Sequence, residues 1–315
     1  MVSRHLPIFS YKGLLKRRMP FHQLQHQLDS QSNINIHNNM NTLSRLVATP
    51  TRIEPKVLST ATRAAKGNLR RIPADSLHVS KPTWWLESRF HFSFADWWDP
   101  ARLNFGALRV VNDDLVQPKA GFGTHPHRDA EIFSYIIDGH LSHKDSMGNS
   151  EALPRGCVQY LSAGTGIAHS EMNEKDERTR FLQIWMTPDR RGHKPQYGSS
   201  KYSKADRHNR LLQILGGTQP MPAWETATAG AGITLHQDAN VFVSEADAGV
   251  SQDILLGQDR QAYLICIEGG LAVNEVDLSM RDAIEIVAND SSAFEVKLTA
   301  GSKGSHFLMI EMQKA

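Results

Sequence analysis

Four side chains with the types and spacing of metal ligands stand close together in the sequence. His125 and His127 lie two residues apart in the glycine-rich segment GFGTHPHR, and His169 and Glu171 lie two residues apart in AGTGIAHSE. Side chains at positions i and i+2 of a strand project to the same face, so each pair is expected to point one way. If the two strands face each other in a barrel, three imidazoles and one carboxylate converge on one small volume.

This donor set is typical of a divalent transition-metal site. Imidazole and carboxylate together suit Fe(II) best, with Mn, Co, Ni, Cu and Zn as the alternatives. The set contains no thiolate, which disfavours a structural zinc site. Four ligands leave one or two octahedral positions open for a substrate or O₂. The flanking glycines let the backbone turn tightly around a crowded centre.

The residues alone leave two questions about this site open. A lone His-x-His pair is more often incidental than metal-binding, and the metal interpretation depends on the second, Gly-flanked pair. Glu131 lies four residues beyond His127, on the same face of a continuous strand, and therefore competes with Glu171 as the carboxylate ligand. His140 and His143 fall in a polar strand and turn, where we expect a place at the surface or beside the ligands.

The elements that must position these side chains are predicted to be short strands. Beyond residue 73, runs rich in Val, Ile, Phe and Tyr alternate with Gly, Pro, Asn and Asp, and no long stretch has a helical period. This pattern predicts an all-β sandwich or barrel. The clearest predicted strands are 107–111, 132–137, 157–161, 181–186, 240–244, 262–267, 294–298 and 306–312.

A faint internal repeat predicts two such domains. Residues 135–141 resemble residues 264–271, because in each an apolar strand ends in an acid and a glycine before an alternating strand begins, as in a hairpin. Residues 153–161 align loosely with 278–286, and chance similarity between amphipathic hairpins is the alternative. The second domain is expected to lack a metal, because its equivalent positions hold residues that cannot bind one: Leu255, Gly257, Phe294 and Val296.

The charge of the chain is unevenly distributed, although the formal net charge is only +2. Residues 1–72 hold twelve Lys and Arg against two acids, and residues 73–315 carry a net charge of −8. The first segment lacks Trp and sustained periodicity, and we predict that it is a largely disordered leader. Its acid-poor, Arg- and Ser/Thr-containing composition is typical of a plastid or mitochondrial transit peptide. An untargeted extension, or a start at Met40, would instead leave the protein in the cytoplasm or nucleus.

Composition excludes several classes of protein. The near-balanced charge, and the −8 of the main body, argue against direct nucleic-acid binding. Cys157 and Cys266 form neither a disulfide framework nor a C-x-x-C motif, and Cys157 is expected in the core. No apolar run approaches the roughly 18 residues of a membrane span. With 40% hydrophobic residues, we expect a globular protein with no membrane partner.

Several motifs, in order, resemble the pirin family, a branch of the cupin superfamily. The resemblance runs from Trp85 to Glu171 and continues more loosely to the C-terminus. It rests on HFSF at 91–94, GALRVVNDD at 106–114, GFGTHPHRDAE at 121–131, HKDSMGN at 143–149 and SAGTGIAHSE at 162–171. The family fold implies two tandem cupin barrels. We place the boundary between them in the polar stretch 192–209, with a metal-binding domain at 73–195 and a domain without metal ligands at 196–315.

The resemblance also implies which residues hold the metal and what the metal is for. It implies one non-haem iron held by His125, His127, His169 and Glu171, which settles the carboxylate in favour of Glu171. Some pirins act as quercetin 2,3-dioxygenases, which predicts a small planar aromatic substrate whose hydroxyl proton Glu171 accepts. Other pirins are iron-dependent protein partners of transcription factors or metabolic enzymes, which predicts a non-catalytic interaction protein. We favour the enzyme.

Overall fold

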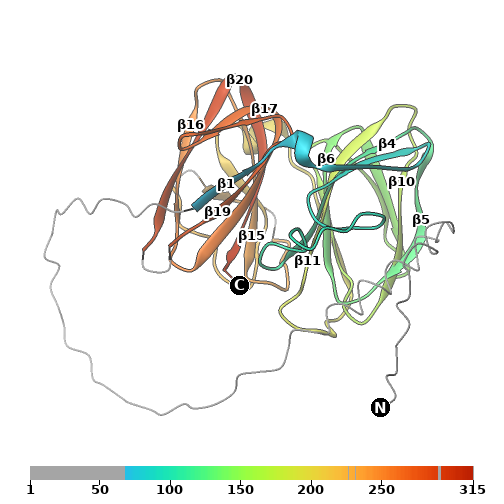
Figure 1. Ribbon diagram of the computed structural model, residues 1–315. Coiled ribbons are helices and arrows are strands. Elements are labelled where there is room, and N and C mark those ends of the chain that lie inside the picture. The colour runs from blue at the N-terminus through green and yellow to red at the C-terminus, as the bar shows by residue number, and fades with distance from the viewer. Residues whose placement is uncertain (1–67, 226, 231, 290–291, 315) are drawn as a thin grey trace, which may run out of the picture. The chain divides into compact units, whose positions relative to one another are not determined.

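Strands dominate the computed structural model, which describes residues 68–225, 227–230, 232–289 and 292–314. Figure 1 shows them gathered in two barrels, one drawn mainly in green and the other mainly in orange to red. The predicted all-β fold with two cupin domains is therefore confirmed. The described helical segments are short: η2 (Ala74–Ser76) and α2 (Lys204–Arg207). No helix in this described part of the chain is long and apolar enough to cross a membrane.

The first barrel consists of two antiparallel sheets. Seven strands follow the order β12-β9-β6-β11-β4-β3-β2, and four follow the order β5-β10-β7-β8. The strands are β2 (His78–Thr83), β3 (Leu86–Phe90), β4 (Leu108–Val116), β5 (Ala120–His127), β6 (Glu131–Asp138), β7 (His140–Asp145), β8 (Ser150–Pro154), β9 (Val158–Ser162), β10 (Ile167–Asn173), β11 (Thr179–Met186) and β12 (Gln196–Ser200).

The second barrel repeats this connectivity with longer strands. The beginning of β20 pairs with β16 and its end pairs with β15, as β10 and β11 pair with β5 and β4. The repeat detected in the sequence is therefore a repeat of topology. The strands are β1 (Asn68–Ile72), β13 (Leu211–Leu215), β14 (Ala227–Ala229), β15 (Ala239–Ala246), β16 (Ser251–Leu256), β17 (Arg260–Val273), β18 (Val276–Ser279), β19 (Ala283–Val287) and β20 (Phe294–Gln313).

The acid-glycine pair makes a corner in the first barrel and lies within the long strand β17 in the second, so the hairpin that we predicted there is wrong. β6 and β7 meet at Gly139 but belong to different sheets. Gly139 has φ +71°, and its counterpart Gly269 has φ +75°. A side chain is disfavoured in this conformation, so the glycine lets the strand leave one sheet and join the other. The sequence signal for positive φ was correct, but it does not distinguish a corner from a hairpin.

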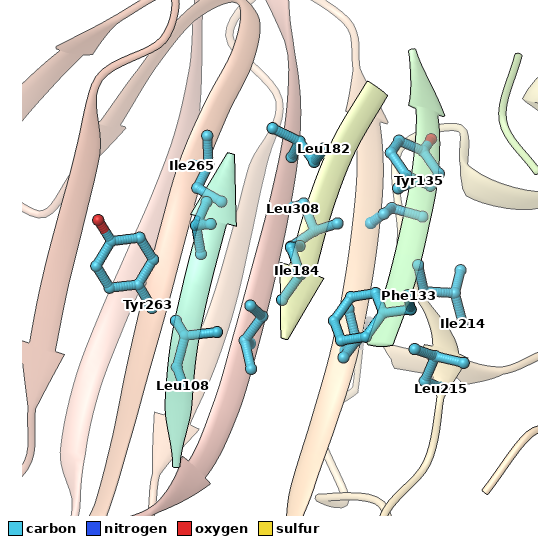
Figure 2. Packing of buried hydrophobic residues seen from close by; sticks show 14 of the residues in the cluster. Leu108, Phe133, Tyr135, Leu182, Ile184, Ile214, Leu215, Tyr263, Ile265 and Leu308 are labelled. Atoms are coloured by element: carbon cyan, nitrogen blue, oxygen red, sulfur yellow. The ribbon is translucent and has the colours of Figure 1, made fainter. Parts of the chain in front are cut away.

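A hydrophobic cluster joins the two barrels (Figure 2). Alternate residues of β6 and β11, including Phe133, Tyr135 and Ile184, pack against Ile265 and Leu308 of the second barrel. Fully burying such side chains stabilises the fold by about 1.5–3 kcal/mol each. The intervening residues of β6 and β11 face the interior of the first barrel instead, because side chains alternate along a strand. That interior contains the candidate site.

The body of the protein begins five residues earlier than we predicted. Residues 68–72, assigned to the leader, form β1, which pairs with β19 of the second barrel. Arg70 lies 2.7 Å from Glu285 and Arg71 lies 2.6 Å from Asp282, measured between side-chain N and O atoms. Ile72 is buried. The remainder of the predicted leader, residues 1–67, lies outside the described residues.

The boundary between the domains also differs slightly from the predicted one. β12, which begins at the first residue assigned to the second domain, pairs with β9 and so completes a sheet of the first barrel. The chain enters the second barrel only at β13. Between them lies α2, whose Ser203 and Asp206 form a capping box. The boundary therefore falls in 201–210. This segment is polar and contains no apolar run that would mark where one domain ends and the next begins.

Candidate metal centre

Two neighbouring strands bring the predicted histidines together. β5 and β10 are paired, and His125 lies directly opposite His169 in their register. His125 and His127 are buried while Pro126 between them is exposed, so both imidazoles point into the barrel. On β10, His169 and Glu171 are likewise buried on one face. The alternation predicted from the sequence is present in both strands.

The three imidazoles form a compact buried group. One ring nitrogen from each of His125, His127 and His169 lies within 4.8 Å of the others. The ring centroids are 4.6 to 4.8 Å apart. Three nitrogen donors at these separations can hold one transition-metal ion.

The protonation of the group also fits a cation. Burial lowers the pKa of His127 to about 3 and that of His169 well below its usual value, each with a smaller effect from its histidine neighbours. Both rings are therefore neutral at physiological pH and carry lone pairs. His125 Nδ1 lies 2.7 Å from the carbonyl oxygen of Gly123, to which it donates, so its Nε2 is the nitrogen with the lone pair.

Several nitrogens of the group have unmet bonding capacity. His127 Nδ1 and both ring nitrogens of His169 are buried without a hydrogen-bond partner among the residues that the structure describes. Leaving a buried polar atom unpaired costs about 1–3 kcal/mol. A metal ion bound between the rings would satisfy such atoms, so this donor set fits the metal that the sequence predicts.

Glu171 lies in the same barrel interior, but its carboxylate is bound to neutral donors. Oε1 accepts a hydrogen bond from Ser134 at 3.0 Å and another from Gln159, and Oε2 accepts one from Gln183 at 2.6 Å. The carboxylate is outside the group formed by the three histidines. Burial raises the pKa of Glu171 to about 7, although the three hydrogen bonds oppose this shift.

A β-bulge separates the environments of His169 and Glu171. His169 pairs with His125, but Glu171 pairs with Phe122, so the register shifts between the two positions. A bulge of this kind redirects the side chains beside it. The i, i+2 spacing therefore placed both residues on one face correctly but did not determine whether their donor atoms meet.

The competing carboxylate, Glu131, serves a different purpose. It is fully buried and accepts hydrogen bonds from Tyr160, from Ser162 at 2.7 Å and from the backbone N–H of His236 at 3.0 Å. β5 ends at His127, and Asp129 adopts φ +48° before β6 begins. The strand alternation that would have placed Glu131 beside the histidines is interrupted there.

The sequence did not identify several side chains that surround the group. Trp185 contacts His127 edge to face, with ring centroids 4.8 Å apart, and Phe94 contacts Trp185 at 5.5 Å. Gln159 and Gln183, which hold Glu171, each interrupt a short apolar run, 157–161 and 181–186 respectively. An isolated amide in such a run is a usable signal, because buried polar groups need partners and mark a polar interior.

The two remaining histidines of this region have different surroundings. His140 is half-buried, and its Nδ1 lies 3.3 Å from Glu177 near the surface. His143 is buried, and its ring centroid lies 5.4 Å from that of His169. The sequence predicted a place either at the surface or beside the ligands. His140 lies near the surface, and His143 lies beside the candidate ligands.

The second barrel carries no comparable group in its described part. The strands equivalent to β5 and β10 are β16 and the beginning of β20, and they carry Leu255, Phe294 and Val296. Among the residues described throughout the chain, the three histidines of the first barrel are the group found that could hold a metal. A polar cavity of about 530 Å³ also lies between the barrels, and none of its lining residues belongs to the histidine group.

Comparisons with known proteins agree with this architecture. The Pirin family profile matches residues 74–186, and a profile described as the quercetinase C-terminal cupin domain matches residues 226–312. A Pseudomonas aeruginosa protein, provisionally named a quercetin 2,3-dioxygenase, is 42% identical over 202 residues, covering 64% of this chain and 84% of the relative. The quercetin 2,3-dioxygenase of Escherichia coli K12 is 35% identical over 206 residues, covering 64% and 83%.

A solved structure adds information about metal binding in a relative. The crystal structure of the bacterial pirin YhhW from Escherichia coli in complex with nickel(II) matches with a TM-score of 0.69 and 29% identity. The match covers 79% of this chain and 100% of that chain. This similarity extends across both barrels.

Proposed function

The chain belongs to the pirin family, and on that basis we propose that it is a metal-dependent dioxygenase of a flavonol-like substrate. The observation that carries the proposal is the buried group of His125, His127 and His169, in which nitrogens of His127 and His169 have no hydrogen-bond partner among the described residues. Two relatives that are named quercetin 2,3-dioxygenases, one of them provisionally, support this reaction class. The small, planar and aromatic substrate predicted from the sequence follows from the same relatives.

The three histidines would hold the metal, with Glu171 as the proposed fourth ligand. To act as one, its carboxylate must exchange a hydrogen bond from Ser134, Gln159 or Gln183 for the ion. Iron(II) remains the metal that we expect, and the nickel(II) complex of a relative shows that another divalent metal binds a pirin. When bound, the metal supplies Lewis acidity and redox chemistry toward O₂.

The protein itself contributes a proton acceptor and a dry, aromatic environment. Burial brings the pKa of Glu171 to about 7, which suits a general base that accepts the proton of a substrate hydroxyl near neutral pH. Trp185 packs against His127, and Phe94 packs against Trp185. Such rings exclude water and offer flat faces to an aromatic substrate.

Oxygen uptake by purified, metal-loaded protein tests the proposal. With Fe(II) and quercetin, the unaltered protein is expected to consume O₂, and His127→Ala is expected to reduce the rate at least about 100-fold because a metal ligand is lost. His140→Ala is the matched control, because this histidine lies away from the three-histidine group. Metal content is measured for each protein by mass spectrometry.

The decisive contrary result is metal-loaded protein that binds quercetin but consumes no more O₂ than His127→Ala. That result would remove the enzyme and leave the non-catalytic interaction protein as the function to test. The same assay over flavonols that differ in single hydroxyl groups identifies the hydroxyl that the site requires. Repeating it with Mn(II), Co(II) and Ni(II) identifies the metals that support the reaction.

A further inference from the structure

A fourth buried imidazole lies directly behind the histidine group. β7 pairs with β10 on the side away from β5 and places His143 opposite Glu171 and Asp145 opposite His169. The side chain of His143 is 1% exposed and that of Asp145 is fully buried. The ring centroids of His143 and His169 are 5.4 Å apart.

Asp145 determines which nitrogen of His143 carries the hydrogen. His143 Nε2 lies 3.1 Å from Asp145 Oδ2, and Asp145 also accepts hydrogen bonds from Asn149 and from the backbone N–H of Met147. Both carboxylate oxygens of Asp145 are occupied by N–H donors: Oδ1 accepts from the backbone N–H groups of Met147 and Asn149, and Oδ2 accepts from the Asn149 amide and His143. Asp145 is therefore an ionised acceptor, Nε2 of His143 is the donor, and Nδ1 of His143 carries a lone pair.

Tyr197 fixes the plane of the His143 ring. The two rings are stacked, with centroids 4.2 Å apart and an angle of 17° between their planes. The Tyr197 hydroxyl donates a hydrogen bond to Glu151 Oε1 at 2.6 Å. Because Asp145 holds the edge of the imidazole and Tyr197 holds its face, His143 has little rotational freedom.

His143 and His169 both have ring nitrogens without hydrogen-bond partners among the described residues, and one ring can donate where the other accepts. Nδ1 of His143 and both ring nitrogens of His169 are buried without a hydrogen-bond partner in the described part of the chain. When one nitrogen of His169 binds a metal, the other carries a hydrogen, and ligating histidines almost always donate it to an outer acceptor. A hydrogen bond between two imidazoles places their centroids roughly 5 Å apart, so a small rotation of the His169 ring from the present separation of 5.4 Å suffices.

We propose that His143 accepts this hydrogen bond from metal-bound His169, and that Asp145 holds His143 in the tautomer that can accept it. His143 and Asp145 are then positioning residues, which orient His169 and strengthen it as a ligand. The inference rests on the metal binding in the proposed function, but it does not depend on the substrate or on the reaction.

Two substitutions separate hydrogen bonding from packing. His143→Phe keeps an aromatic ring against Tyr197 but removes the acceptor. Asp145→Asn keeps the size and the acceptor oxygen of residue 145, but its amide can donate to His143 Nε2 and so places the hydrogen on Nδ1. Both variants are expected to weaken Ni²⁺ binding about 10- to 100-fold. His143→Asn, whose amide oxygen can replace Nδ1, is expected to restore part of the affinity.

Ni²⁺ affinity is measured by calorimetry against a competing chelator, using the full chain. Pulsed electron paramagnetic resonance of the Cu²⁺-loaded proteins supplies the second measurement. The quadrupole coupling of the remote imidazole nitrogen reports its hydrogen bonding, and we expect it to change in His143→Phe and Asp145→Asn. The matched control is His140→Phe, on the same strand beside the carboxylate of Glu177, which should match the unaltered protein in both measurements. Circular dichroism of the metal-free proteins checks their folding.

The outcomes distinguish this inference from the proposed function. If the unaltered protein binds Ni²⁺ and both variants keep its affinity within twofold and its quadrupole coupling, the inference is wrong and the metal site stands. If only His143→Phe weakens binding, Asp145 does not set the tautomer of His143, and the inference is again wrong. If the unaltered protein binds no divalent metal, the proposed function fails together with it.

Discussion

At the scale of single residues, the interior of the first barrel contains several buried polar side chains. Ser134, Gln159, Glu171 and Gln183 form a hydrogen-bonded cluster there, and Asp114 is buried nearby. Buried polar groups need partners, and these residues largely supply them to each other. This part of the interior is therefore packed with polar rather than apolar side chains, and it can hold a charged group such as the carboxylate of Glu171.

Asp114 should make stability depend on pH. Burial, more than any other cause, raises its pKa to about 8, against an opposing hydrogen bond from Ser88. Between the ordinary value of 3.8 and this one, the folded protein holds a proton that the unfolded chain has lost, so stability falls as the pH rises. Asp114→Asn removes this dependence. Urea unfolding of both metal-free proteins measures the free energy of unfolding from about pH 5 to about pH 8. The stability of the variant should rise relative to that of the unaltered protein over this range. If the two free energies change in parallel with pH, Asp114 is not the group responsible.

The histidines were predictable from the sequence, but the position of the fourth donor was not. The spacing of His125 and His127 and of His169 and Glu171 fixes their faces, because strand alternation is local. The carboxylate of Glu171 is positioned by Ser134, Gln159 and Gln183, which come from three other strands. Nothing in the neighbouring sequence encodes those contacts.

At the scale of the elements, Gly139 sets where the chain leaves one sheet of the first barrel for the other. Gly139 combines φ +71° with a close approach, because a side chain there would place its Cβ 2.6 Å from the carbonyl oxygen of Arg178. Gly148 lies in the turn that follows β7. It has φ +97°, but the space around it is open. A side chain at Gly148 would therefore add backbone strain alone, whereas one at Gly139 would add both strain and steric overlap.

Gly139→Ala is expected to destabilise the protein by more than Gly148→Ala does. Strain at positive φ costs about 1–3 kcal/mol, and only Gly139→Ala adds an overlap with the backbone. Chemical denaturation of the two variants measures the difference directly. Equal losses in the two variants would show that β6 and β7 can shift apart at the corner and that the close approach has no energetic weight.

Strands with a nearly continuous apolar run were predictable, whereas edge strands held by partners distant in sequence were not. Phe181 to Met186 shows its strand in the sequence because alternate residues face two buried environments. β1 contains two arginines in five residues, and Arg70 finds its partner Glu285 at a separation of 215 positions. Local patterning cannot reveal a strand whose stability comes from such a contact.

At the scale of the whole molecule, the barrels are joined both by the shared apolar cluster and by charges. Arg155 of the first barrel lies 2.6 Å from Glu268 of the second, and Tyr135 forms a 2.9 Å hydrogen bond with His306. These contacts border the cavity between the domains, whose lining includes Arg155, Glu268 and His306. The barrel without ligands therefore supports the barrel that carries the site.

Removing β1 should destabilise the second barrel. A chain that begins at residue 73 loses the ladder between β1 and β19, two ion pairs and buried Ile72, whose burial alone stabilises by about 1.5–3 kcal/mol. A chain that begins at residue 68 keeps all of these and serves as the control. Guanidinium unfolding should separate the two chains by at least that amount; coincident curves would show that β1 contributes nothing to stability.

The place of β1 limits how the N-terminal region can be processed. Targeting to an organelle remains a prediction from composition, and any peptidase that removes such a leader must cut before Asn68 if the edge of the second barrel is to stay covered. A cut a few residues later would expose the unpaired edge of β19, and exposed strand edges promote aggregation. Any N-terminus that such processing would create is thus constrained by the domain at the opposite end of the chain.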